Sequence, residues 1–150
     1  MVVSALLVLA CATVLLYMRQ QARQNNVRMH EVTATGVGEP LQLFFISVTH
    51  ARKINKKMIK SIPGKVDAVI IGGDFVDRRT SEQTLHENIR LLNTLGPTYF
   101  VWGNNDVEFD EQKLKQLFLQ HNVTLLENEA VRIGKQRDFY LSAVTYRPGE

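Results

Sequence analysis

The stretch Ala68-Val69-Ile70-Ile71-Gly72-Gly73-Asp74, continued by Phe75-Val76-Asp77-Arg78, decides the fold of this 150-residue chain. Its apolar run predicts a short buried strand, because a continuous apolar segment bounded by turn residues is typical of such strands. The two glycines stop the strand and let the Asp74 carboxylate project from a tight turn with little steric obstruction. We therefore expect a strand that delivers Asp74 to its carboxyl end.

Two similar passages from strand to loop flank this stretch. Leu41 to Val48 is an apolar run that leads into Thr49-His50, and Tyr99 to Trp102 leads into Gly103-Asn104-Asn105-Asp106. Apolar residues at helical spacing follow each of the three runs, namely Ile54, Met58, Ile59 and Ile62, then Leu85, Ile89 and Leu92, then Leu114, Leu117 and Phe118. This alternation predicts an α/β fold with βαβ units and a parallel sheet covered on both faces. Residues 123–126, 130–133 and 139–144 are further strand candidates.

Polar side chains follow each of the three strands at the point where the strand ends. Parallel strands place their carboxyl ends on one edge of the sheet, so we expect His50, Asp74 and Asn104 to lie on a common rim. Imidazole, carboxylate and amide oxygen together suit a divalent ion such as Mn, Fe or Zn. Two ions bridged by one carboxylate would hold a phosphoryl group, with Arg78 pairing with its oxygens. Taken singly, each residue is also consistent with ordinary loop chemistry.

The three blocks Ile46-Ser47-Val48-Thr49-His50, Gly72 to Arg78, and Gly103-Asn104-Asn105-Asp106 resemble the first three blocks of the calcineurin-like metallophosphoesterases. Those blocks read D-x-H, G-D-x-x-D and G-N-H-[DE], in this order and after successive strands. The resemblance covers about residues 41–150. It implies the amino-terminal βαβ half of a four-layer α/β/β/α sandwich, with a two-metal centre that hydrolyses phosphoric esters.

The resemblance also implies a role for each matching residue. His50 would bind the first metal ion, Asp74 would bridge both ions, and Asn104 would bind the second. Arg78 would lie near the substrate phosphate, and Asp77 would support the loop.

The chain departs from the family pattern at several donor positions. Val48 stands at the first metal-binding aspartate and has no donor atom, and Asn105 stands at the histidine that assists the leaving group. An amide cannot donate a proton as an acid, and Asp106 is left without the histidine it would orient. No histidine follows His121, so the later family histidines have no counterpart.

The amino-terminal segment, Met1 to Met18, contains no charged side chain. As a helix it spans roughly 27 Å, close to the ~30 Å hydrocarbon core of a bilayer. We expect a transmembrane anchor at 1–18, a polar juxtamembrane linker at 19–40 and the phosphoesterase domain at 41–150. The arginines after the apolar run, Arg19, Arg23 and Arg28, favour a cytoplasmic carboxyl-terminal domain. The alternative is a cleaved signal, for which Ala10-Cys11-Ala12 offers small residues.

The composition excludes several classes of function. The formal charge of +3 is too small by itself to indicate nucleic-acid binding, and no P-loop or G-x-G-x-x-G motif is present. The single cysteine, Cys11, excludes an intrachain disulfide framework. Basic residues crowd the first soluble helix (Arg52, Lys53, Lys56, Lys57 and Lys60). They form either a solvated polar face or a contact with an anionic cytoplasmic leaflet. We expect His86 and His121 to face solvent.

Three functional interpretations remain open at this point. The first is a membrane-anchored, metal-dependent phosphoesterase whose activity in this chain is absent or impaired. The second is a non-catalytic remnant that binds metal weakly at most, or serves as a membrane-associated interaction module. In the third, another polypeptide completes the site. A half-sheet leaves a strand edge and an apolar face uncovered, which predicts self-association.

Overall fold

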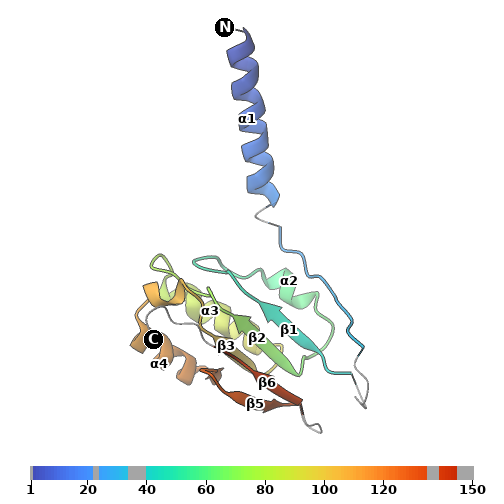
Figure 1. The fold of residues 1–150 in the computed structure, drawn as a ribbon, viewed down its shortest axis with the longest axis vertical. Helices are drawn as coiled ribbons and strands as arrows, with labels where there is room; N and C mark the ends of the chain where they lie inside the picture. Colours follow the sequence, from blue (N-terminus) through green and yellow to red (C-terminus); the bar gives the residue numbers. More distant parts are fainter. Residues whose placement is uncertain (1, 22–23, 34–39, 135–138, 145–150) are drawn as a thin grey trace. The chain divides into compact units, whose positions relative to one another are not determined.

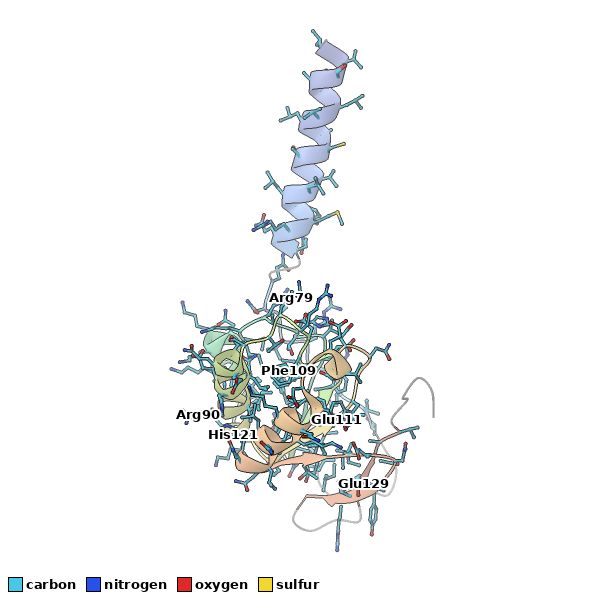
Figure 2. The ribbon with its side chains drawn as sticks, turned by 90° about the vertical axis from the view of Figure 1, so that its left-hand side faces the viewer. Arg79, Arg90, Phe109, Glu111, His121 and Glu129 are labelled. Atoms are coloured by element: carbon cyan, nitrogen blue, oxygen red, sulfur yellow. The ribbon has the colours of Figure 1, made fainter. Side chains whose placement is uncertain are left out.

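The computed structural model describes residues 2–21, 24–33, 40–134 and 139–144. The chain divides into two compact units, Met1–Glu31 and Val32–Glu150. The first unit contains α1 (Val2–Gln21), whose side chains are all exposed and project on every side of the helix (Figure 2). Within the described ranges, α1 alone is long and apolar enough to cross a membrane, a criterion that signal sequences also meet.

Helix α1 extends beyond the apolar run that predicted it. The polar residues Arg19, Gln20 and Gln21 continue the helix, because arginine and glutamine are good helix formers. The Gln21 side chain also donates a hydrogen bond to the Tyr17 hydroxyl at 2.9 Å. The predicted linker therefore begins as helix, and Arg23 lies outside the described residues.

The second unit is a mixed α/β structure (Figure 1). Its elements in chain order are β1 (Leu43–Ile46), α2 (Lys56–Lys60), β2 (Ala68–Gly72), α3 (Glu82–Asn93), β3 (Thr98–Val101), η1 (Asp106–Glu108), α4 (Glu111–Gln120), β4 (Val123–Leu125), β5 (Ala130–Ile133) and β6 (Phe139–Ser142). Strands β1 to β4 form one sheet in the order β1-β2-β3-β4, and each neighbouring pair is parallel. Strands β5 and β6 pair antiparallel in a separate two-stranded sheet. The predicted parallel sheet is confirmed.

Helices α2, α3 and α4 pack on the same face of the parallel sheet. One core cluster joins Ile59 of α2, Ile89 of α3 and Phe118 of α4 to alternate residues of the strands, including Ile71 and Phe100. The strand order never reverses, so right-handed crossovers place every connecting helix on the same side.

The opposite face is open at the edge strand β1, where Phe45 is 63% exposed and Leu43 is 46% exposed. The Phe45 ring lies over Gly72 of the neighbouring strand, where a Cβ atom would come within 2.2 Å of the ring. The expectation of a parallel sheet covered on both faces is therefore wrong for β1. Because the helices cover only one face of the sheet, the other face of β1 is exposed to solvent.

Helix α3 and the carboxyl-terminal cap of α4 carry the two histidines that the sequence predicted to face solvent. The Ser81 side chain caps α3 by accepting a hydrogen bond from the Thr84 N–H. His86 and His121 do not face solvent freely, because His86 Nδ1 and His121 Nε2 lie 2.6 Å apart in a hydrogen bond. Burial, followed by the nearby His86, lowers the pKa of His121.

Candidate functional site

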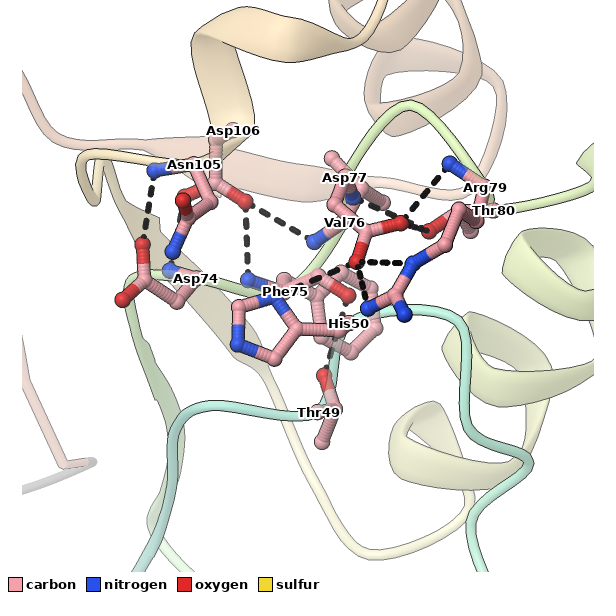
Figure 3. A network of polar contacts seen from close by, with 10 residues as sticks. All are labelled: Thr49, His50, Asp74, Phe75, Val76, Asp77, Arg79, Thr80, Asn105 and Asp106. Atoms are coloured by element: carbon pink, nitrogen blue, oxygen red, sulfur yellow. Dashed lines mark hydrogen bonds and ion pairs between the residues drawn. The ribbon is translucent and has the colours of Figure 1, made fainter.

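Three loops meet at the carboxyl ends of β1, β2 and β3. The Val48 N–H donates to the Gly73 carbonyl at 3.2 Å, and the His50 N–H donates to the Asp74 carbonyl at 3.1 Å. The Asn105 N–H donates to Asp74 Oδ1 at 2.8 Å. These hydrogen bonds bring together the loops that carry His50, Asp74 and Asn105. Figure 3 shows the bond between Asn105 and Asp74.

The second and third loops touch through two glycines. A Cβ atom on Gly73 would lie 2.8 Å from Gly103 Cα, and one on Gly103 would lie 2.3 Å from the Asp74 nitrogen and 2.5 Å from its Oδ1. Real Cβ atoms do not approach so closely. Glycine is therefore required for the contact that places the Asp74 carboxylate.

Replacement of Gly103 by alanine is expected to destabilise the domain by about 3 kcal/mol, because the two loops must move apart to admit the methyl group. Unfolding is measured on the full chain in detergent by the fluorescence of Trp102, the single tryptophan of the sequence. Gly64→Ala is the matched control. A Cβ atom at Gly64 meets nothing within 4 Å, although φ there is +70°. Equal destabilisation in the two variants would contradict the close-contact interpretation.

Asp106 is the central acceptor of this site. Its Oδ2 accepts hydrogen bonds from the N–H groups of Asp74 at 2.8 Å and Gly103 at 2.7 Å, and its Oδ1 accepts from those of Phe75 at 2.7 Å and Val76 at 2.9 Å. The residue is fully buried. Burial raises the pKa of its carboxyl, and the four N–H groups act in the opposite direction. The sequence left Asp106 without a partner, whereas its partners are backbone groups of both loops.

Asp77 lies between a histidine and an arginine. Arg79 donates to Asp77 Oδ2 through Nε at 3.2 Å and through its terminal nitrogen at 2.6 Å. These hydrogen bonds hold the pKa of Asp77 below its ordinary value, although burial acts against them. His50 Nδ1 lies 3.6 Å from the same oxygen, and this buried nitrogen has no hydrogen-bond partner among the described residues.

The arginine that pairs with Asp77 is Arg79, which the sequence analysis did not identify. Arg78 is exposed in the turn and makes no hydrogen bond or ion pair with the part of the chain that the structure describes. Asn104 is likewise exposed, between Gly103 and Asn105. Only the turn geometry decides which of two adjacent arginines faces Asp77, so the sequence carries no signal for the choice.

The backbone of the site is strained at three residues that are not glycine. Val48, His50 and Asp74 have φ angles of +54°, +50° and +52°. Such angles are disfavoured for side chains with a Cβ atom, most strongly for β-branched residues, and they cluster at functional sites. Val48 therefore combines an unfavourable backbone angle with a side chain that is 55% exposed and has no donor atom.

Comparison with known proteins agrees with this arrangement of loops. The family model of calcineurin-like phosphoesterases matches residues 44–143. The chain belongs to this family. Phosphoesterases of this kind generally hydrolyse phosphoric esters with the help of metal ions, and the matched segment contains all three loops described above.

Two curated relatives come from Bacillus subtilis strain 168. The uncharacterized protein YpbG is 34% identical over 133 residues, which are 86% of this chain and 51% of YpbG. The uncharacterized metallophosphoesterase YkoQ is 36% identical over 126 residues, which are 76% of this chain and 46% of YkoQ. The chain thus spans about half the length of the curated relatives it matches. No solved structure matches it significantly.

The residues of this site fit the metal centre of a calcineurin-like phosphoesterase only in part. The side chains of His50, Asp74 and Asn104 have suitable donor chemistry, and a carboxylate beside the second imidazole nitrogen is typical of metal-binding histidines. However, Val48 supplies no donor, and no group of three or more His, Cys, Asp or Glu that could hold an ion occurs within the described ranges. The chain's own acids and histidine are therefore fewer than a two-metal centre uses.

Proposed function

We propose that this chain takes part in metal-dependent hydrolysis of phosphoric esters, with His50, Asp74 and Asn104 as ligands of Mn, Fe or Zn. The observation that carries the proposal is the pairing of loops at the sheet edge. The His50 N–H is bonded to the Asp74 carbonyl, and the His50 imidazole lies beside the buried carboxylate of Asp77. When bound, such ions polarise the phosphoryl group and activate water.

The neighbouring residues have separate tasks in this proposal. Asp77, itself held by Arg79, lies beside Nδ1 and orients the His50 ring so that Nε2 faces the ion. Arg78 is exposed and unpaired within the described residues, so its guanidinium is available to a phosphate. Asn105 occupies the position of the family histidine, but its amide transfers no proton. Its backbone N–H instead positions the Asp74 carboxylate.

The test is Mn²⁺ binding and Mn²⁺-dependent hydrolysis of an aryl phosphodiester by the full chain in detergent. Asp74→Asn is the informative variant, because asparagine tolerates the positive φ of +52° and keeps an oxygen for the Asn105 N–H while it removes the charge. We expect this variant to lose both Mn²⁺ binding and Mn²⁺-dependent hydrolysis.

Glu129→Ala, which removes an exposed acid elsewhere in the same unit, is the matched control and should leave both activities unchanged. Mn²⁺ binding that Asp74→Asn leaves intact would overturn the ligand assignment.

A non-catalytic, membrane-associated module is the second candidate, and Val48 is the observation that favours it. Its side chain has no donor at the position of the first metal-binding aspartate. Absence of Mn²⁺-dependent hydrolysis in the unmodified chain would favour this candidate. The exposed face of β1, with Phe45 and Leu43, is where we propose that a second sheet of a four-layer sandwich, or a second copy of the chain, would pack.

For the location of the protein, we propose a single-pass membrane protein with α1 as the anchor and the α/β domain on the cytoplasmic side. The support is the uncharged run of α1, followed by Arg19 and Arg28 with no acid before Glu31. Resistance of the expressed chain to alkaline extraction tests the anchor, and protease protection in sealed vesicles tests the orientation.

A further inference from the structure

The positive charge of this chain is concentrated in one short segment. Residues 52–65, here called the basic segment, hold six of the 18 Lys and Arg residues and none of the 15 Asp and Glu residues. The rest of the chain holds 12 basic and 15 acidic residues, so without the basic segment it would be net negative. The overall charge of +3 conceals this asymmetry.

The structure places the basic side chains of this segment in solvent. Ile54, Met58, Ile59 and Ile62 pack on the core cluster and fix the orientation of α2. The charged members all remain exposed, and they are Arg52, Lys53, Lys56, Lys57, Lys60 and Lys65. Within the described residues, the ion pair of this segment is Lys53–Glu87 at 2.9 Å, so the other five charges are not neutralised by direct pairing.

We propose that the basic segment binds the anionic headgroup surface of the bilayer that α1 enters, which gives the domain a second contact with the membrane. The inference rests on the proposed membrane location. The tether raises the effective concentration of that surface, so weak attraction for each lysine is enough. A planar anionic surface needs only charge for its recognition. Binding of single-stranded nucleic acid also uses aromatic stacking, and the segment has no aromatic residue.

The experiment measures the acylation rates of individual lysines by peptide mass spectrometry. The full chain is reconstituted in phosphatidylcholine bilayers with and without phosphatidylglycerol, and alkaline extraction first verifies that α1 is inserted. We expect Lys56, Lys57, Lys60 and Lys65 to react at least about three-fold more slowly in the anionic bilayer. Lys113 and Lys115 of α4 should react at the same rate in both. At about 1 M salt, where the screening length falls to about 3 Å, the protection should disappear.

Two variants that each remove three positive charges distinguish a specific effect of the basic segment from an effect of the net charge. Replacement of Lys56, Lys57 and Lys60 by glutamine should abolish the protection of Lys65, whereas replacement of Lys113, Lys115 and Arg132 should preserve it. Equal loss in both variants, or equal acylation rates in both bilayers, would overturn the proposal. Protection of these lysines that depends on added nucleic acid, and not on the anionic lipid, would also overturn the proposal. A chain that alkali extracts would overturn it together with the proposed anchor. Mn²⁺ binding is measured separately and is independent of these results.

Discussion

Replacement of Asp106 by alanine is expected to destabilise the α/β domain by about 4 kcal/mol, the largest loss of stability that we predict for a single substitution in this chain. The carboxylate is the acceptor for four backbone N–H groups from two loops. Each buried donor left without an acceptor costs about 1–3 kcal/mol, and water that enters the space of the lost side chain recovers part of that. Because whole domains are stable by only about 5–15 kcal/mol, this loss would bring the chain close to unfolding.

The measurement is urea unfolding of the full chain in detergent, followed by Trp102 fluorescence, which reports on the α/β domain because α1 contains no tryptophan. Amide hydrogen exchange at residues 74–76 and 103 should increase before global unfolding. The loss of stability of Asp106→Asn should lie between zero and that of Asp106→Ala. The amide keeps one acceptor oxygen but turns an NH₂ group toward two donors.

Asp110→Ala is the matched control for Asp106→Ala. It also removes an aspartate that accepts a backbone hydrogen bond, but this residue is exposed and caps α4 through a single bond from the Lys113 N–H. Loss of such a cap costs about 1 kcal/mol. If Asp106→Ala destabilises no more than Asp110→Ala, the four hydrogen bonds do not hold the two loops together.

The sheet could be predicted from the sequence because each βαβ unit carries its own local signals. The apolar run before Gly72-Gly73 and the helical spacing of Leu85, Ile89 and Leu92 both give the correct elements within a few residues. The βαβ pattern predicted helices on both faces, which is wrong for β1, and only the half-sheet that the family resemblance implies predicted an uncovered apolar face. One-sided coverage by helices follows from the strand order together with crossover handedness, and single elements do not reveal the strand order.

Only those parts of the candidate site whose role depends on the type of side chain could be predicted from the sequence. His50 and Asp74 were identified because they follow strands and can bind metal, and the structure brings their loops together. The task of Asp106 could not be predicted, since its partners are backbone N–H groups that any residue provides. The contact of Gly73 with Gly103 likewise joins residues thirty positions apart, and nothing in either loop alone indicates the other.

Val48→Asp is expected to raise the affinity of the chain for Mn²⁺ by at least about ten-fold, because it adds a carboxylate in the loop beside Asp74. The Val48 N–H already donates a hydrogen bond to the Gly73 carbonyl. The substitution therefore changes the side chain and does not require the backbone of the loop to move. Electron paramagnetic resonance of free Mn²⁺ in a titration measures the affinity directly and does not depend on hydrolytic activity.

The substitution also changes the backbone, and a second variant separates the two effects. Valine is poorly tolerated at the φ of +54°, whereas aspartate and asparagine are several-fold enriched at such angles. Both Val48→Asp and Val48→Asn should therefore relieve strain of about 1 kcal/mol or more. Only the aspartate variant adds a charged ligand, so equal Mn²⁺ affinities of the two variants would contradict the ligand role of position 48.

Stability with and without metal completes the comparison. Without Mn²⁺, the new carboxylate lies in a loop bonded to that of Asp74, and repulsion between the like charges offsets part of the backbone relief. The asparagine variant should then be the more stable of the two. With Mn²⁺ in large excess over its dissociation constant, binding to the folded state stabilises the aspartate variant further, by about 2.7 kcal/mol at a hundred-fold excess. A reversal of the stability order on addition of Mn²⁺ is thus the outcome that identifies position 48 as the missing ligand. Strain relief alone would leave the order unchanged.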